Sequence, residues 1–318
     1  MRHAAGAFAL TLATGLALYP AFISLLARLR AGQRVAAYGP GSHAVKEGTA
    51  TMGGLLFCAL AVLVWLLFDR SRSGFVAVFA LSAGASVGLL DDLANIRGTA
   101  ALGLHPRQKL VLQCFAGALV GIGVHAVGLT HQWIPRFGSP NLGWGVAVLA
   151  AVALVACSNA VNLTDGVDGL AASCSIAAFT ATGMIGLHQH NVPAVVISAG
   201  LVGALCAFLV FNWFPARVFM GDTGALALGS ALVVVSAELG LLWLLPLLGL
   251  VFLAETLSVI VNVTAITRFG RHVLRASPLH HHFELLGLGE QRLVPAFAAA
   301  AVAGAGAVVL LAVVGQPR

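Results

Sequence analysis

The sequence contains few charged residues. Only 9% of its 318 residues are Asp, Glu, Lys or Arg, whereas 59% are hydrophobic. The mean hydropathy is correspondingly high, at +0.97. Such a composition cannot supply the polar surface that a water-soluble domain needs. The shortage of charge therefore excludes an ordinary soluble enzyme and indicates a protein embedded in a membrane.

The sequence also lacks cysteine pairs with metal-ligand spacing and any convincing internal repeat. Its five cysteines lie inside apolar runs, where they are best interpreted as small buried hydrophobes. The missing repeat argues against an inverted-repeat transporter. The sequence pI is about 9.6. Because the basic residues flank the apolar runs, as topology signals do, we expect no nucleic-acid partner.

Long apolar runs are what the sequence has in abundance. A helix of about 20 apolar residues spans the hydrocarbon core of a bilayer. The sequence predicts an all-α, polytopic membrane helix bundle with about ten spans, at 5–27, 50–68, 73–90, 109–128, 143–162, 167–187, 193–212, 223–238, 241–266 and 294–314. The connections are short, so we expect residues 1–318 to form a single integral membrane domain with no cleaved signal peptide.

The positive charges predict the orientation. Counting Lys and Arg on alternate sides of the spans gives twelve on one side and five on the other. The positive-inside rule places the richer side in the cytoplasm, with both termini extracytoplasmic. Of the eleven acidic residues, eight fall on that same side. Carboxylates at a hydrocarbon boundary are costly, so this gathering indicates a functional site, although Glu47 and Glu290 are better explained as solvated loop residues.

The first acidic motif is "VGLLDDLANIRG", which contains Asp91 and Asp92. Adjacent carboxylates repel each other, and the end of a helix disfavours negative charge. A metal-binding or proton-accepting role explains this pair better than helix capping does.

Two further motifs combine carboxylates, amides and glycines. "SNAVNLTDGVDGLA" carries Asn159, Asn162, Asp165 and Asp168, and a helix cap would explain only one of its acids. "FNWFPARVFMGDTGALALG" carries Asn212, Phe219 and Asp222. Phe219 suits stacking on a base or packing at the membrane interface, and both interpretations remain open.

Lys46 and Thr51 lie in "AVKEGTATMGG", which is typical either of an anion-binding turn or of a basic flank.

The motif "RASPLHHHFELLG" contains three consecutive histidines, His280, His281 and His282. Consecutive histidines point in different directions and rarely bind one zinc ion, so a hydrogen-bonding role toward a diphosphate is the better interpretation. The carboxylate and amide oxygens of the other motifs suit Mg²⁺ or Mn²⁺.

In order and placement, these motifs resemble the polyprenyl-phosphate N-acetylhexosamine-1-phosphate transferase superfamily, from about residue 20 to 297. The triple histidine followed by Phe-Glu is similar to the branch that uses UDP-N-acetylmuramoyl-pentapeptide. The resemblance implies transfer of its phospho-sugar to undecaprenyl phosphate with Mg²⁺, at the cytoplasmic face of the bacterial inner membrane, giving lipid I and UMP for peptidoglycan biosynthesis. It also allows a homodimer. A sister transferase for another UDP-N-acetylhexosamine, or a non-catalytic nucleoside-binding paralogue, are the alternatives.

The resemblance also assigns roles to residues. It makes Asp222 the main metal ligand and Asn159 a second, and it directs Asp91 and Asp92 to the lipid phosphate. The histidines would contact the diphosphate or sugar, His281 foremost. The nucleotide-sugar pocket would be lined by Lys46, Thr51, Asn162, Asp165, Asp168, Asn212 and Phe219.

One departure from the superfamily concerns a cation. Asn95 stands where the superfamily typically has a lysine, and the loop that follows offers only Arg97, Arg107 and Lys109 as replacements. We expect Arg97 to take this role, because its long side chain can bind a phosphate in a bidentate manner.

Overall fold

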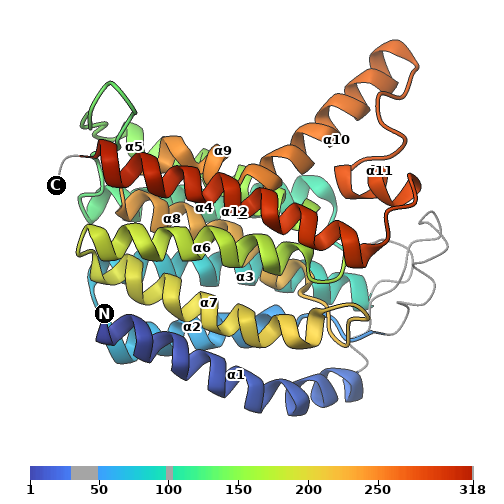
Figure 1. Ribbon diagram of the computed structural model, residues 1–318, viewed down its shortest axis with the longest axis horizontal. Helices are drawn as coiled ribbons and strands as arrows, with labels where there is room; N and C mark the ends of the chain where they lie inside the picture. Colours follow the sequence, from blue (N-terminus) through green and yellow to red (C-terminus); the bar gives the residue numbers. More distant parts are fainter. Residues whose placement is uncertain (30–48, 98–102, 317–318) are drawn as a thin grey trace.

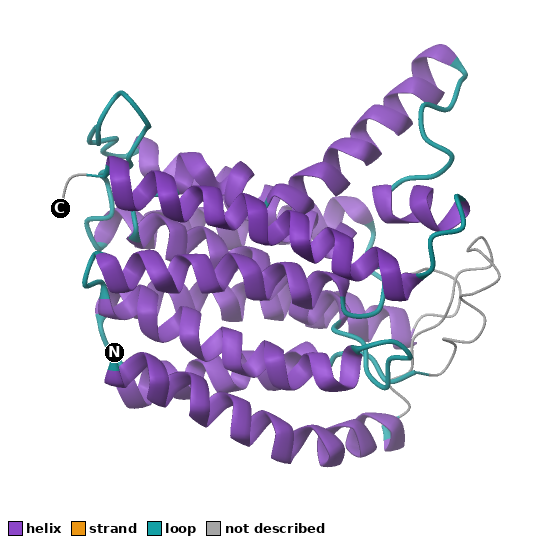
Figure 2. Cartoon of the chain, in the orientation of Figure 1, coloured by secondary structure: helices purple, strands orange, loops and turns teal. Residues whose placement is uncertain are grey.

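The computed structural model describes residues 1–29, 49–97 and 103–316, and every regular element in these ranges is a helix (Figure 2). The longer helices are α1 (Arg2–Arg28), α2 (Gly54–Phe68), α3 (Arg72–Arg97), α4 (Pro106–Ala126), α5 (Gly145–Thr164), α6 (Leu170–His188), α7 (Val192–Asn212), α8 (Gly221–Glu238), α10 (Leu250–Phe269) and α12 (Glu290–Gly315). Shorter ones are the 3₁₀ helix η2 (Leu242–Leu244), α9 (Leu245–Leu248) and α11 (Leu279–Leu285).

The helices have the lengths that a membrane requires. Within the described ranges, eight are long and apolar enough to cross a bilayer, namely α1, α3, α4, α5, α6, α7, α10 and α12. The apolar α2 is shorter, with 15 residues, and α8 runs through the bundle interior (Figure 1). The predicted polytopic helix bundle is confirmed.

The ninth predicted span, 241–266, is broken rather than continuous. Its first part forms η2 and α9, and α10 starts only after Gly249. Pro246 lies in the first turn of α9, where proline favours the start of a new helix, and Gly249 adopts a non-helical backbone conformation between α9 and α10. The break lets α10 lean away from the other helices at the end of the bundle that carries α11 (Figure 1).

Helix α8 forms the centre of the bundle. All of its residues from Thr223 to Glu238 are buried. It packs against α3 so closely that a β-carbon at Gly88 would overlap the backbone carbonyl of Asp222. Small residues allow such close contacts between membrane helices. Because Asp92 follows Gly88 by four residues, it lies on the same face of α3 and meets the first turn of α8.

The first turn of α1 and the last turn of α12 lie at one end of the bundle, and the first turn of α8 lies at the other (Figure 1). The first and last helices therefore have their outer ends on one side, as the predicted topology requires. Which side of the membrane this is remains a prediction.

Candidate active site

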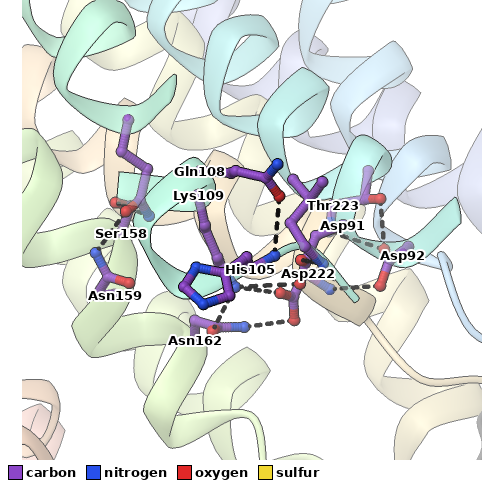
Figure 3. A network of polar contacts seen from close by, with 12 residues as sticks. Asp91, Asp92, His105, Gln108, Lys109, Ser158, Asn159, Asn162, Asp222 and Thr223 are labelled. Carbon is purple, nitrogen blue, oxygen red and sulfur yellow. Dashed lines mark hydrogen bonds and ion pairs between the residues drawn. The ribbon is translucent and has the colours of Figure 1, made fainter. Parts of the chain in front are cut away.

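Lys109 lies at the centre of a polar cluster formed by four helices (Figure 3). Its ammonium nitrogen contacts Asp222 Oδ2 of α8 and lies 3.3 Å from Asp91 Oδ2 of α3. The same nitrogen donates to Asn162 Oδ1 of α5 at 3.3 Å. The side chains of the three charged residues remain 15% to 24% exposed. The cluster is thus partly open to a ligand.

The start of α4 places Lys109 in this position. His105 is the N-cap residue and Pro106 occupies the first helical position, where proline is favoured because no partner for its nitrogen is needed. His105 Nδ1 accepts from the Arg107 amide, and Gln108 Oε1 accepts from the His105 amide, which forms a capping box. Lys109 therefore lies in the first turn of α4. The positive end of the helix dipole disfavours a cation there, and the two carboxylates offset this cost.

Asn162 holds Asp222 from the other side. Its side-chain nitrogen donates to Asp222 Oδ1 at 2.7 Å, while its oxygen accepts from Lys109. The two carboxylate oxygens of Asp222 thus have different partners, an amide and an ammonium. This arrangement fixes the orientation of a carboxylate that belongs to the first turn of α8.

Asp92 binds the backbone of the same turn. Its carboxylate accepts from the amides of Asp222 and Thr223 at 3.1 and 3.0 Å, and from the Thr223 hydroxyl at 2.6 Å. Gly221 has a φ of +73°, and a β-carbon there would lie 2.7 Å from Asp92 Oδ2. Glycine is thus required before Asp222 for two reasons, its backbone conformation and the nearness of Asp92.

Asn159, the predicted second metal ligand, lies one turn before Asn162 and is bonded elsewhere. Its side-chain nitrogen donates to Gln113 Oε1 at 3.0 Å and to the Val155 carbonyl at 2.8 Å. Gln113, which is buried, also donates to Ser158 Oγ at 3.3 Å. Asn162, rather than Asn159, is the amide in contact with Asp222.

The predicted nucleotide-pocket residues gather around the α5–α6 and α7–α8 connections. Asp168 Oδ2 accepts from the Ala216 amide at 2.9 Å, and Asn212 Oδ1 accepts from the Gly169 amide at 3.0 Å. These bonds tie the two connections together. Asp165 ends α5 within the first of them.

The segment before α2 joins the same region. Its residue Ala50 accepts from the Phe219 amide at 2.8 Å. Thr51 is buried and Phe219 is half-buried. Lys46 lies outside the described residues, as does the side chain of Arg97.

The three histidines lie in α11 and have different surroundings. His280 is buried, with its Nδ1 3.2 Å from Glu255 Oε1 of α10. His281 Nδ1 lies 2.6 Å from Glu284 Oε2, and its side chain is 24% exposed. His282 Nδ1 accepts from the Arg275 amide at 3.1 Å. Of the three, His280 is the one enclosed by protein.

The donor set around Lys109 suits a hard divalent cation, because it offers carboxylate and amide oxygens. In the parts of the chain that the structure describes, no three or more His, Cys, Asp or Glu side chains are arranged to hold a metal ion. An ion at Asp222 would therefore take its other ligands from amides, water and phosphate oxygens. Mg²⁺ usually binds in this manner.

Sequence reasoning gave too little weight to two residues. Lys109 is only one of three candidate cations in the sequence, and among the described side chains it contacts Asp91 and Asp222. Glu255 belongs to none of the sequence motifs, and it lies inside the ninth predicted span. An ionisable residue inside a span is itself a signal of function, and it could have drawn attention to Glu255.

Comparison with known proteins shows the family of this chain. Residues 73–240 match the sequence profile of glycosyl transferase family 4. A "Phospho-N-acetylmuramoyl-pentapeptide-transferase" of Geobacillus kaustophilus is 42% identical over 287 residues, which cover 88% of this chain and 89% of that protein. Proteins of the same name from Clostridium botulinum and Halalkalibacterium halodurans are 39% and 42% identical, covering 90% and 88% of this chain and 89% and 88% of their own lengths. The chain belongs to glycosyl transferase family 4.

Proposed function

We propose that this protein transfers phospho-N-acetylmuramoyl-pentapeptide from UDP-N-acetylmuramoyl-pentapeptide to undecaprenyl phosphate, giving lipid I and UMP in peptidoglycan biosynthesis. The relatives that cover nearly nine-tenths of the chain carry the name of this transferase. The observation that carries the proposal is the contact of Lys109 with Asp91, Asn162 and Asp222 at one end of a membrane bundle. We place that end at the cytoplasmic face of the inner membrane, where the nucleotide sugar is present.

The transfer reaction requires that the negative charge of the phosphates be neutralised and that the attacking and leaving oxygens be aligned. In the net reaction, an oxygen of the lipid phosphate becomes bonded to the sugar-linked phosphorus, and the bond from this phosphorus to the bridging oxygen of UMP breaks. Negative charge gathers on the phosphoryl oxygens and on the departing UMP. Phosphoryl transfer is accelerated mainly by positioning and by fixed positive charge, rather than by covalent help.

The residues of the cluster divide these tasks. Lys109 supplies a fixed positive charge beside Asp222. Asp91 lies beside Lys109 and is the carboxylate suited to face the lipid phosphate and to accept its proton. His281, half-buried in α11, is suited to contact the diphosphate or sugar. The α5–α6 connection, with Asp165 and Asp168, would line the nucleotide-sugar pocket.

Mg²⁺ is part of this proposal. Asp222 would hold the ion, and Asn162 is the amide in contact with Asp222. Bound Mg²⁺ neutralises phosphate charge and polarises the phosphoryl oxygens. The chain's own contribution is to fix the orientation of Asp222, through Asn162 and Lys109 on its side chain and through Asp92 on its backbone.

Release of UMP tests the proposal. Purified protein in detergent is given undecaprenyl phosphate, Mg²⁺ and one UDP-sugar at a time. We expect UMP and a lipid-linked product from UDP-N-acetylmuramoyl-pentapeptide, and at least a hundredfold less from UDP-N-acetylglucosamine. A preference for the second sugar would assign a sister transferase. Binding of UDP-sugars without UMP release would assign a non-catalytic paralogue.

A further inference from the structure

A buried carboxylate in α10 is attached to the histidine helix. Glu255 is fully buried, and its two oxygens accept from the His280 amide at 3.2 and 3.3 Å. Its Oε1 also lies 3.2 Å from His280 Nδ1. Burial of a carboxylate is costly unless partners compensate for the lost water. His280 supplies such compensation through its backbone amide, and its ring lies beside the same carboxylate.

The other ring nitrogen of His280, Nε2, faces Gly166 in the α5–α6 connection. A β-carbon at Gly166 would overlap His280 Nε2, so the imidazole lies directly against the α5–α6 connection. Both ring nitrogens of His280 are buried and have no hydrogen-bond partner among the described residues.

The α5–α6 connection is held between two supports. On one side, Asn212 and the Ala216 amide bind Gly169 and Asp168. On the other side lies His280, against Gly166. Asn162, in the last turn of α5 just before this connection, bonds to Asp222. A shift of the connection would therefore move the amide that orients Asp222.

A second polar residue of α10 supports the same arrangement. Asn262 lies seven residues after Glu255, so both lie on one face of the helix. Its side-chain oxygen accepts from the amides of Val273 and Leu274, both at 3.1 Å. Asn262 also donates to Ser277 Oγ at 3.3 Å, so it holds the segment before α11, whereas Glu255 contacts the His280 ring.

We propose that Glu255 is a positioning residue of the transferase centre. Its carboxylate holds the His280 imidazole against Gly166, and this contact fixes the α5–α6 connection and, through Asn162, the orientation of Asp222. The assignment gives His280 a supporting position behind the substrate pocket. It leaves His281 as the histidine that faces the substrate. The inference rests on the proposed function for its effect on turnover, but its structural part can be measured without any reaction.

Hydrogen–deuterium exchange of the purified protein, in detergent and without substrate, tests that structural part. Glu255→Gln keeps the shape and an acceptor but removes the charge next to His280. We expect amide exchange in residues 165–169 and in α11 to be at least tenfold faster than in the unchanged protein. Ser258→Ala is the matched control, because Ser258 is buried in α10 and donates only to the Glu255 backbone carbonyl. Unchanged exchange at 165–169 in Glu255→Gln contradicts the proposal.

Turnover tests whether Glu255 acts through His280. We expect Glu255→Gln and His280→Phe each to lower kcat about tenfold, with less than a threefold change in KM for the UDP-sugar. Because both variants break the same contact, the double variant should be no more than about threefold slower than the slower single variant. If the two decreases in kcat multiply, so that the double variant is about a hundredfold slower than the unchanged protein, the proposal is contradicted. If the unchanged protein shows no transfer, the proposed function fails, while the exchange result still decides the role of Glu255.

Gly166→Ala provides an independent variant in case Glu255→Gln does not fold. Its new methyl group displaces the His280 ring while the carboxylate stays in place. We expect the same faster exchange in α11. If exchange in α11 equals that of the unchanged protein, the contact between the His280 ring and Gly166 does not hold α11 in place, and the proposal is overturned.

Discussion

Asp91 and Asp92 are neighbours in α3, yet they bind different partners. Asp91 Oδ2 lies 3.3 Å from the Lys109 ammonium and its Oδ1 accepts from the Leu104 amide before α4, whereas Asp92 accepts backbone and hydroxyl hydrogen bonds from the first turn of α8. Successive residues of a helix are about 100° apart around its axis, so a pair can divide in this manner. One acid therefore faces the partly open cluster, and the other is buried and holds the segment that carries Asp222.

Because the two acids have different partners, we expect their substitution to affect stability and turnover differently. Asp92→Asn removes charge-assisted bonds to buried amides, so we expect it to lower the free energy of unfolding by about 2 kcal/mol and to reduce turnover. Asp91→Asn is the matched comparison. It should lower turnover with little change in melting temperature. Melting curves and UMP release, measured on the same detergent preparations, decide the point. Equal melting temperatures for the two variants contradict the division.

Lys109 is expected to be the essential cation of the α3–α4 region. Lys109→Met leaves Asp91 and Asp222 without the ammonium between them, so we expect turnover to fall at least a hundredfold. Arg107→Met is the control, because Arg107 lies two residues earlier and is exposed. Steady-state UMP release should remain within threefold of the original value in that variant. The opposite ranking would give the role to Arg107.

The close contact of α3 with α8 predicts a stability effect. Gly88→Ala places a methyl group against the Asp222 carbonyl, and overpacking of this kind costs about 1–3 kcal/mol. Gly306→Ala in α12 is the control, since a β-carbon there has no atom within 4 Å. It should be neutral or stabilising by about 0.5–1 kcal/mol, because alanine favours a helix over glycine. Thermal unfolding measures both. A Gly88→Ala protein as stable as Gly306→Ala would contradict the packing.

The topology predicts which loops are reached from the cytoplasm. In a cysteine-free background, thiols are introduced at Ser277, in the α10–α11 connection, and at Ser139, in the α4–α5 connection, and these two connections lie at opposite ends of the bundle (Figure 1). A membrane-impermeant maleimide should label Ser277→Cys only from the cytoplasmic side and Ser139→Cys only from outside. The expectation rests on the asymmetry of Lys and Arg. Reversed labelling would place the cluster outside the cell.

Much of the fold follows from the sequence, because the length and apolarity of each run set the number of spans. The site also followed in part, since acids at one side of a membrane bundle are costly unless used. Lys109 and Asp222 are 113 positions apart in the chain, so their contact depends on how α4 packs beside α8. The attachment of His280 to Glu255 depends on the break at Gly249 and on the direction of α10. Apolar periodicity carries no information about either.

The most direct test of the central claim, that Asp222 and its partners form the transferase centre, uses the two ends of α8. Formation of lipid I is measured with UDP-N-acetylmuramoyl-pentapeptide, undecaprenyl phosphate and Mg²⁺ for the unchanged protein, Asp222→Asn and Glu238→Gln. Asp222 lies in the first turn of α8, and Glu238 is its last residue, at the opposite end of the bundle. We expect product from the unchanged protein and from Glu238→Gln, and at least a thousandfold less from Asp222→Asn with an unchanged melting temperature. Comparable product from Asp222→Asn would contradict the account.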